Sequence, residues 1–228
     1  MLRLPTALAL SIAQLGDPAI LRVLAKSLAI TLALFALLGG AMLVGLYRYL
    51  LSLDAAFSVE LSALAAVVLT VIAGWLLFRI IALFVLQFFA DEVVLAVEAR
   101  HYPHAFGTAR KVGLGEEFRG SARALLRAVL VNLAALPFAI LLLATGIGTA
   151  ILFWAVNAWL LGRELQDMVW LRHRAAEDEG QPLGAATRFA LGGIVAALLL
   201  VPFANLLAPV LGAASATHLV HRNRPVHA

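Results

Sequence analysis

The segment LGDPAILRVLAKS carries the sequence signals of a helix N-terminus, and two cations follow within the next turns. Asp17 is typical of a residue that caps a helix, and Pro18 is typical of the first helical position. Arg22 follows about one helical turn later, and Lys26 about one turn after that. The free N–H groups of a helix N-terminus and the guanidinium group of an arginine both bind oxyanions, so this segment could hold a small anion. Because Asp17 competes for the same N–H groups, a capped surface helix is the alternative interpretation.

A stripe of arginines lies further along the chain, at Arg119, Arg123 and Arg127. A spacing of four residues places them on one face of a helix. Such a face either meets the anionic headgroups of a membrane surface or forms an electropositive funnel that concentrates a small anion at the mouth of a pathway. The spacing leaves both interpretations open.

Two more ionisable residues stand in apolar surroundings. Arg79 interrupts a long apolar helix, where an arginine either faces a cavity or partner inside the membrane or extends toward the headgroups. Glu98 ends the segment DEVVLAVE and could pair with nearby cations or act as a gate that repels anions. A solvated helix end is the alternative interpretation of Glu98.

The remaining residues give no sign of catalysis or of a metal site. The chain has no cysteine, and no nucleophile–base constellation, Walker loop or dinucleotide fingerprint is present in the sequence. His101 and His104 are separated by Pro103 and lack an evident third ligand. The histidines near the C-terminus are interpreted as an interfacial helix end: His218, His221 and His227. We therefore expect no enzyme activity, no cofactor and no metal.

The composition places these residues in a membrane. Hydrophobic residues make up 63% of the 228 positions, and charged residues only 13%, about half of what a soluble domain carries. The class is therefore an integral membrane protein. The orientation of such a protein accounts for its basic charge, so we expect no nucleic-acid partner.

The long apolar runs set the expected architecture. The run 27–47 matches the roughly 20 residues that cross a bilayer, and the run 61–90 exceeds that length and must tilt or project. The run 128–162 carries TGIG at its centre, where Gly146 and Gly148 supply a turn. Each of its two arms is short for a span, so we predict a helical hairpin that enters the membrane and returns.

The last apolar run, 189–221, is predicted to form a second hairpin. Pro202 ends its first arm, Asn205 is expected to cap the second arm, and Pro209 is expected to fall in the first turn of that arm. Irregular backbone at membrane depth is tolerated where protein or a watery cavity covers it. The tips of both hairpins are therefore expected to be interior features, packed on each other or on a partner subunit. The free N–H groups at the second tip, with Asn205, could contact an anion.

The cations orient the expected fold. All but two of the 17 Lys and Arg residues, Arg48 and Arg79, fall in segments on one side of this layout, which is the cytoplasmic side by the positive-inside rule. Both termini are then cytoplasmic, although full crossings by the hairpins would give the same result. We expect an all-α membrane domain with these parts: an amphipathic segment (1–26), span 1 (27–47), span 2 (61–90), a basic cytoplasmic region (91–127), hairpin 1 (128–162), a cytoplasmic connection (163–188), hairpin 2 (189–221) and a tail (222–228).

Two segments of the chain resemble signature regions of the CysZ sulfate-transporter family, which shares its domain with the eukaryotic etoposide-induced proteins. The segment TGIGTAILFWAVNAWLLGRELQDM resembles the first region, with Thr145 in the place of a proline of the family's turn. The segment LVPFANLLAPVLGAASATHLVH resembles the second. It matches the family's pattern at Pro202, Asn205, Leu206, Pro209 and Val210, and at the small residues 212–217. FFADEVVLAVEAR and DPAILRVL are similar to two further family segments, with Glu98 and Arg22 at recurring acidic and basic positions.

The resemblance implies an oligomeric α-helical inner-membrane protein with two long spanning helices and two partly inserted hairpins. It also implies sulfate uptake that supplies cysteine biosynthesis. In the sulfate-transporting branch, a Gly-Leu-Thr-Ser-like element beside an arginine is implicated in anion binding. Here that element reads QLGDPAILR, with an acidic residue and no Thr-Ser pair. The resemblance therefore supports the fold more strongly than it supports sulfate as the substrate.

Two functions are consistent with these observations. The first is a permease or channel-like transporter for sulfate or a similar small anion. Arg22, Lys26 and Asn205 would contact the anion, and Glu98 and Arg79 would act as electrostatic partner or gate. The second is a membrane scaffold without transport, whose hairpins bind lipid or a partner complex.

Overall fold

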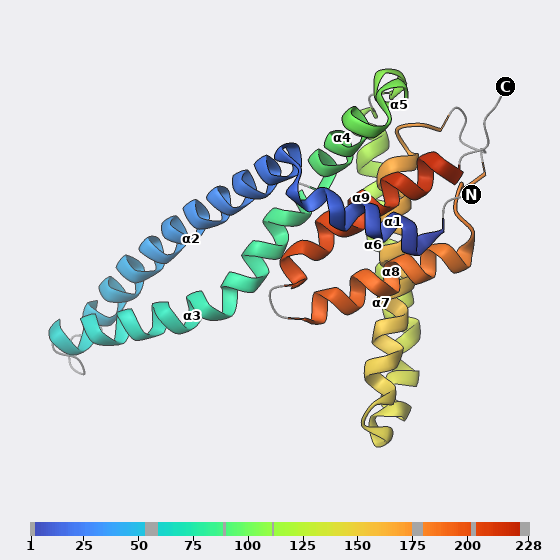
Figure 1. The fold of residues 1–228 in the computed structure, drawn as a ribbon. Helices are drawn as coiled ribbons and strands as arrows, with labels where there is room; N and C mark the ends of the chain where they lie inside the picture. The colour runs from blue at the N-terminus through green and yellow to red at the C-terminus, as the bar shows by residue number, and fades with distance from the viewer. Residues whose placement is uncertain are drawn as a thin grey trace. The chain divides into compact units, whose positions relative to one another are not determined.

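The computed structural model describes residues 3–52, 59–88, 90–110, 112–174, 180–201 and 204–223. Within these ranges the chain is helical and contains no strand, which confirms the predicted all-α class. The helices are α1 (Leu4–Ala13), α2 (Pro18–Ser52), α3 (Val59–Phe88), α4 (Ala90–His101), α5 (Pro103–Thr108), α6 (Leu114–Leu142), α7 (Gly148–Trp170), α8 (Ala185–Leu200) and α9 (Ala204–Asn223), with 3-10 turns η1 (Gln14–Gly16) and η2 (Leu143–Thr145) (Figure 1).

The chain divides into two compact units, which we describe separately. The long-helix unit is 21–89 and contains most of α2 and all of α3. These two helices run in opposite directions and diverge from the end at which α2 finishes and α3 begins (Figure 1). The Phe35 ring of α2 lies so close to Gly74 of α3 that a β-carbon at Gly74 would be 3.0 Å from the ring. The glycine at this position therefore leaves room for the Phe35 ring.

The second unit, which we call the core unit, contains residues 1–20 and 90–228. Its C-terminal helix α9 contacts α1, α4, α7 and α8, so it is buried from several sides. Small and β-branched residues make this packing possible, because they allow helices to approach closely. The buried apolar residues include Ala7, Val93, Val94, Val97, Val169, Leu191, Val195, Val210, Leu219 and Val220.

Two glycines bring α7 and α8 into backbone contact. A β-carbon at Gly192 of α8 would overlap the backbone carbonyl oxygen of Ala158 in α7. A β-carbon at Gly162 of α7 would overlap the carbonyl oxygen of Arg188. The neighbouring Gly193 accommodates the Trp154 ring, whose Nε1 donates a hydrogen bond of 3.0 Å to the Gly193 carbonyl. This pair of helices depends on glycine at both contact positions.

Helices α6 and α7 form the predicted first hairpin. Gly146 has φ of 72°, in the left-handed region that favours glycine, and it turns the chain between η2 and α7. The Thr145 hydroxyl accepts a hydrogen bond of 2.9 Å from the Gly148 N–H and donates one of 2.7 Å to the Leu142 carbonyl. The turn predicted at TGIG is confirmed. The Thr145 hydroxyl also provides a hydrogen-bond acceptor for the first backbone N–H of α7.

Helices α8 and α9 form the second hairpin, but its turn differs from the prediction. Pro202 lies outside the described residues. Helix α9 begins at Ala204, so Asn205 lies in the first turn, and its backbone N–H donates 3.0 Å to the Val201 carbonyl. The prediction that Asn205 caps the second arm is therefore wrong, because Asn205 is itself part of the helix. Pro209 lies inside α9 beyond its first turn, so its missing N–H leaves one carbonyl of the preceding turn without a helical donor.

Among the described residues, two helical segments are long and apolar enough to cross a membrane, namely Pro18–Ser52 and Phe118–Thr145. The first contains the predicted span 27–47. The second comprises most of α6 and the turn η2, which form the first arm of hairpin 1. Helix α6 begins before the uncharged run 128–162, so this arm is longer than the run predicted. The described apolar part of α3 is 61–74, and the side chains of 75–88, including Arg79, lie outside the described residues. Helix length therefore does not exclude a full crossing by hairpin 1.

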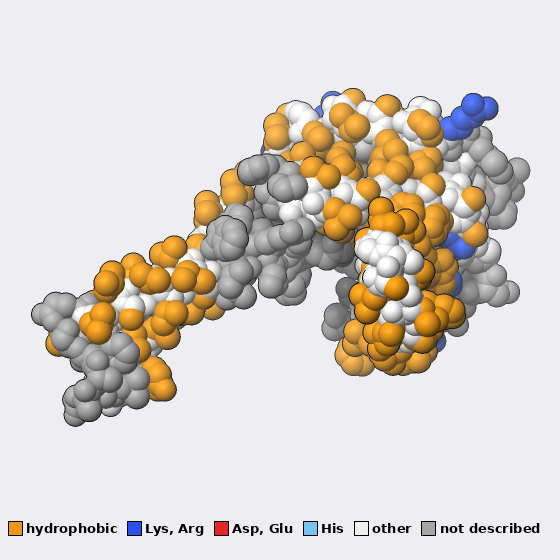
Figure 2. All heavy atoms as spheres, turned by 90° about the horizontal axis from the view of Figure 1, so that it is seen from below, with side chains coloured by type: hydrophobic (Ala, Val, Ile, Leu, Met, Phe, Trp, Pro, Cys, Tyr) orange, Lys and Arg blue, Asp and Glu red, His pale blue; other side chains and the backbone are white. Residues whose placement is uncertain are grey.

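The far end of the α6–α7 hairpin is covered with apolar side chains (Figure 2). Leu141 is 74% exposed, and Leu143 and Ile147 are also largely exposed. Exposed apolar surface of this extent marks contact with a membrane or a partner. The hairpin tip is therefore not covered by the rest of the core unit, and its packing on a partner subunit stays a prediction.

We predict that Gly192→Ala destabilises the core unit, because the new methyl group displaces the α7 backbone and separates α7 from α8. The free energy of unfolding should fall by an amount on the order of 2–3 kcal/mol, and the apparent melting temperature in detergent should fall by several degrees. Gly120→Ala is the matched control, since Gly120 is a helical glycine with open space around it and alanine favours helix there. An equal melting temperature for Gly192→Ala and the unmodified protein would contradict the packing described.

Candidate functional site

A carboxylate with no solvent exposure lies at the centre of the core unit. Glu98 near the end of α4 accepts a hydrogen bond of 2.7 Å at Oε1 from His173 Nε2 and one of 3.0 Å at the same oxygen from His221 Nε2. An Nη2 atom of Arg172 lies 3.6 Å from Oε2. His173 and Arg172 follow the end of α7, and His221 lies in the last turn of α9. Three segments that are far apart in the sequence therefore meet at one carboxylate, which we call the Glu98 cluster.

The Glu98 cluster keeps this buried carboxylate ionised. Burial by itself raises the pKa of Glu98, but the hydrogen bonds from His173 and His221 and the positive charge of Arg172 outweigh burial and lower the pKa to about 2. The rings also hold each other in place, because the His173 and His221 rings meet edge to face with centroids 4.8 Å apart. The interpretation of Glu98 as a solvated helix end is therefore wrong.

A second polar network adjoins the Glu98 cluster through stacked rings. The Tyr102 ring stacks on His221 at 4.6 Å, and its hydroxyl lies 2.8 Å from Nδ1 of His218. The amide nitrogen of Gln14, in η1, lies 2.8 Å from Nε2 of His218 and 3.0 Å from Nε2 of His101. This network therefore joins the N-terminal segment to α4 and α9.

The partners of His218 define its protonation. If the Gln14 amide donates to Nε2, then Nδ1 of a neutral His218 carries the proton and donates to the Tyr102 oxygen. The Tyr102 oxygen also accepts from Arg222 Nε at 3.3 Å. Burial, followed by the nearby His101, Arg222 and His221, lowers the pKa of His218 to about 4. His218 is therefore neutral at physiological pH.

A pocket of about 270 Å³ lies where α1 leads into α2. Its lining includes the side chains of Gln14, Asp17, Arg100 and His101 and the first residue of α2, Pro18. Asp17 accepts a hydrogen bond of 3.1 Å from the Ala19 N–H, which confirms the predicted cap, and its other oxygen lies 2.5 Å from Arg100 Nη1. The Oε1 atom of Gln14 is buried without a hydrogen-bond partner. The pocket thus combines polar groups with the beginning of α2.

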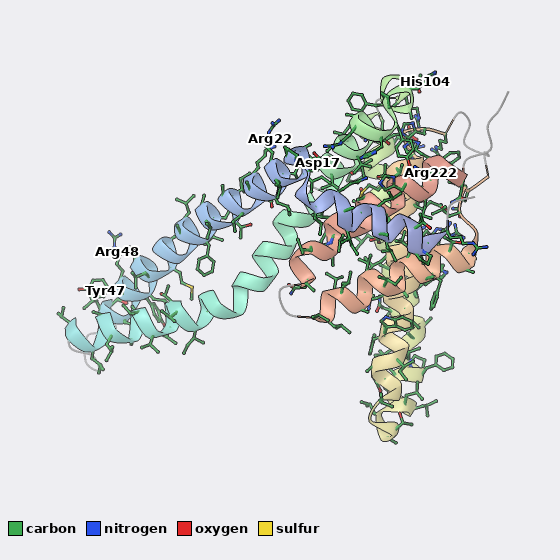
Figure 3. All side chains as sticks on the ribbon, viewed as in Figure 1. Asp17, Arg22, Tyr47, Arg48, His104 and Arg222 are labelled. Atoms are coloured by element: carbon green, nitrogen blue, oxygen red, sulfur yellow. The ribbon has the colours of Figure 1, made fainter. Side chains whose placement is uncertain are left out.

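The predicted anion contacts fall in both units. Arg22 and Lys26 are exposed residues of α2 in the long-helix unit. Figure 3 shows Arg22 and Arg48 projecting outward from α2, away from α3. Asn205 is 7% exposed and lies in the core unit with Glu98. The pairing of Arg22 with Glu98 stays a prediction, and the side chain of Arg79 lies outside the described residues.

The arginine stripe does not behave as one solvated face. Arg119 and Arg123 are exposed, whereas Arg127 is half-buried, with Nη2 4.0 Å from an Asp167 carboxylate oxygen of α7. The Nε atom of Arg127 is buried without a hydrogen-bond partner. The end of the stripe nearest the apolar part of α6 is therefore an ion-pair contact within hairpin 1.

A separate ion cluster fixes the loop that precedes α6. Glu116 binds Arg110 with both carboxylate oxygens, at 2.6 and 2.8 Å, and accepts a further bond of 2.7 Å from Arg174. These two arginines lower the pKa of Glu116 to about 2. The Arg110 backbone N–H also donates 3.0 Å to the Arg172 carbonyl. The loop that carries Arg172 and His173 is therefore held beside the start of α6.

Sequence reasoning missed most of the buried polar residues. Gln14, Tyr102 and His173 were not among the predicted site residues, and the interpretation of His218 and His221 as an interfacial end is wrong, since both side chains are buried. His227 lies outside the described residues. A signal was present in the spacing of His218 and His221, which are three residues apart and share a face of α9. Their partners could not be found, because they come from other helices.

The fold and the site define an all-helical protein with apolar helices of membrane-spanning length and a buried polar centre. The chain matches the family described as "Sulfate transporter CysZ/Etoposide-induced protein 2.4" over residues 7–209, which is most of its length. The chain therefore belongs to this family, as its signature segments predicted. No curated protein and no solved structure matches it. Family membership and the apolar helices together indicate a membrane protein of a transporter family.

We predict that acid destabilises the core unit through His218. The folded-state pKa of about 4 lies below the ordinary value of 6.5, so the unfolded chain takes up a proton as the pH falls through this window and the folded chain does not. The free energy of unfolding should fall between pH 6.5 and pH 4, by at most about 3 kcal/mol. Melting temperatures in detergent across this range measure the effect. His101, His221, Arg222 and Tyr102 surround the titrating ring.

In His218→Asn the pH dependence over this window should be flatter, whereas the exposed His104→Asn should keep the slope of the unmodified protein. Parallel pH profiles for His218→Asn and the unmodified protein would rule out His218 as the titrating group. The slope is the informative quantity, because loss of the buried ring also lowers stability at neutral pH.

Proposed function

We propose that this protein is an inner-membrane permease or channel-like transporter for a small anion, with sulfate as the first candidate. The imported sulfate would supply the sulfur for cysteine biosynthesis. The observation that carries the proposal is the match to the CysZ sulfate-transporter family over residues 7–209. The chain supplies no nucleotide-binding motif that would drive transport with ATP. Movement of the anion is therefore passive or coupled to another ion, without an enzymatic step.

The beginning of α2 is the proposed point of anion contact. Arg22 and Lys26 place two cations in the first turns after Asp17 and Pro18. The acidic Asp17 is the feature of this element that opposes an anion. Because the Asp17 carboxylate already binds Arg100 and the Ala19 N–H, much of its charge is neutralised. A nearby oxyanion would then interact chiefly with Arg22 and Lys26.

Asn205 is the proposed third contact, in an oligomer that brings several donors together. A divalent oxyanion loses its hydration on entering a membrane, so several fixed donors are needed to compensate. The burial of Asn205 at the start of α9 supports a fixed rather than a mobile amide. In this scheme Glu98 and Arg79 act as electrostatic partner or gate, and the exposed Arg119 and Arg123 attract anions or bind headgroups on the cytoplasmic side.

The proposed topology places both termini in the cytoplasm, with two long spans and two hairpins partly inserted in the bilayer. The positive-inside distribution of Lys and Arg supports this orientation. The turn at Gly146 and Gly148, with its apolar exposed tip, supports entry of hairpin 1 into hydrocarbon. The connection between α8 and α9 is the proposed tip of hairpin 2.

A second function is favoured by the same exposed tip. Leu141, Leu143 and Ile147 could bind lipid or a partner complex, which would make the protein a membrane scaffold without transport. The two functions differ in whether an anion crosses the membrane. Growth of a sulfate-uptake-deficient strain on limiting sulfate separates them, because only a transporter restores it.

We predict that Arg22→Ala abolishes most sulfate flux in proteoliposomes, because the guanidinium group compensates the charge of the entering anion. Flux of radiolabelled sulfate should fall at least about tenfold, which corresponds to the loss of one charge-assisted contact. Arg48→Ala is the matched control, since Arg48 is an exposed arginine of the same helix near its other end. Assembly is checked by gel filtration of both variants.

Full flux through Arg22→Ala would exclude Arg22 as the anion contact while leaving transport intact. Absence of sulfate flux through the unmodified protein, with correct assembly, would instead favour the scaffold. These two results are distinguishable because the first concerns a residue and the second concerns the activity.

A further inference from the structure

The three side chains that meet in the Glu98 cluster are also a set of metal ligands. One ligand atom from each of Glu98, His173 and His221 lies within 4.8 Å of the other two. The side chains of Glu98, His173 and His221 are 0%, 2% and 4% exposed. Two imidazoles and one carboxylate are a donor set used by zinc sites that keep one coordination position open. The cluster thus has the chemistry of a metal site, beyond the proposed transport of an anion.

The distances in the cluster suit a tetrahedral ion after a small adjustment. Metal–ligand bonds of 2.0–2.1 Å place two ligands of a tetrahedral zinc about 3.3 Å apart. Glu98 Oε1 lies 2.7 Å from His173 Nε2 and 3.0 Å from His221 Nε2. An opening of a few tenths of an ångström therefore admits the ion between atoms that already point at one another. Both histidines present the same ring nitrogen to the same oxygen.

The surroundings hold these ligands in position. Arg172 lies 3.6 Å from Glu98 Oε2, whereas Oε1 is the oxygen that faces both histidine nitrogens. The Tyr102 ring stacks on His221, and the His173 ring meets His221 edge to face. Neighbours that fix the orientation of ligands raise metal affinity in known sites. The ligands also come from three segments, so an ion would join α4, the end of α7 and α9.

We propose that Glu98, His173 and His221 bind one divalent transition-metal ion, with Zn²⁺ as the best match to the ligand set. Without the ion, each imidazole carries a proton on Nε2 and donates it to Glu98. An ion bound at Nε2 requires that nitrogen to be unprotonated, so each neutral ring would bind the ion as the tautomer that carries its proton on Nδ1. The fourth coordination position is filled by water or a small anion. The positive charge of Arg172 opposes a second cation nearby, so affinity for the ion rests on the three ligands.

The first test measures binding of Zn²⁺ to the full-length protein purified in detergent without a polyhistidine tag. We expect about one equivalent of Zn²⁺ per chain by elemental analysis after gel filtration, and a higher melting temperature with micromolar Zn²⁺ than with a chelator. His173→Asn and His221→Asn should each weaken Zn²⁺ binding at least about tenfold. His218→Asn and His104→Asn are the controls, one a buried histidine of the adjoining network and one an exposed histidine, and both should bind as the unmodified protein does.

The second test uses Co²⁺ and does not depend on the tolerance of the fold for asparagine. The chain has no cysteine, so His221→Cys introduces a single thiol. If residue 221 is a ligand, this variant loaded with Co²⁺ should gain a thiolate-to-cobalt charge-transfer absorption in the near ultraviolet. His218→Cys should not gain it.

Zn²⁺ binding below about one tenth of an equivalent by the unmodified protein would overturn the proposal. Equal binding by His221→Asn and the unmodified protein, or a charge-transfer band in His218→Cys but not in His221→Cys, would also overturn it. Loss of sulfate flux leaves these readouts unchanged, so failure of the proposed transport and failure of this metal site are distinguishable.

Discussion

The structure of the core unit depends on the burial of one ionised carboxylate. Glu98 has no solvent exposure, and an isolated charge in such a place would be strongly unfavourable. It is stable only because His173 and His221 donate to it and Arg172 lies nearby. None of these partners belongs to α4: Arg172 and His173 follow α7, and His221 lies in α9. The carboxylate therefore requires that the end of α7 and the last turn of α9 pack against α4.

The rest of the core unit follows from this requirement. Glycines at 162 and 192 bring α7 and α8 into backbone contact, and α8 leads into α9, which returns to α4. Because α9 carries both His218 and His221, the same helix serves the Glu98 cluster and the adjoining network. Gln14 completes that network from the N-terminal side, and it holds the chain next to the pocket at the beginning of α2. The polar network and the pocket at the beginning of α2 are therefore built by the same contacts.

Local sequence signals predicted local structure well. Asp17 and Pro18 predicted the beginning of α2, and TGIG predicted the turn at Gly146, because caps and turns depend on a few neighbouring residues. Asn205 shows the limit of such reasoning. Its type is typical of a cap, but α9 includes it.

The buried site could not be predicted in the same way. Glu98 and its partners His173 and His221 are separated by 75 and 123 positions, and no local pattern relates them. A glutamate at the end of a helix is usually solvated, and histidines near a basic C-terminus are usually interfacial. Only the packing of α9 against α4 reverses both interpretations, and this packing is a property of the whole fold. The family resemblance identified Glu98 as a recurring position, but not its partners.

Glu98 and His221 stabilise the fold through each other. A double-mutant cycle with Glu98→Ala and His221→Ala measures this coupling directly, from unfolding in detergent with a chelator present so that no bound ion contributes. The account predicts a coupling free energy of about 1.5–3 kcal/mol, as expected for a buried hydrogen bond to a charged group. Effects of the two substitutions that add within about 0.5 kcal/mol would contradict it.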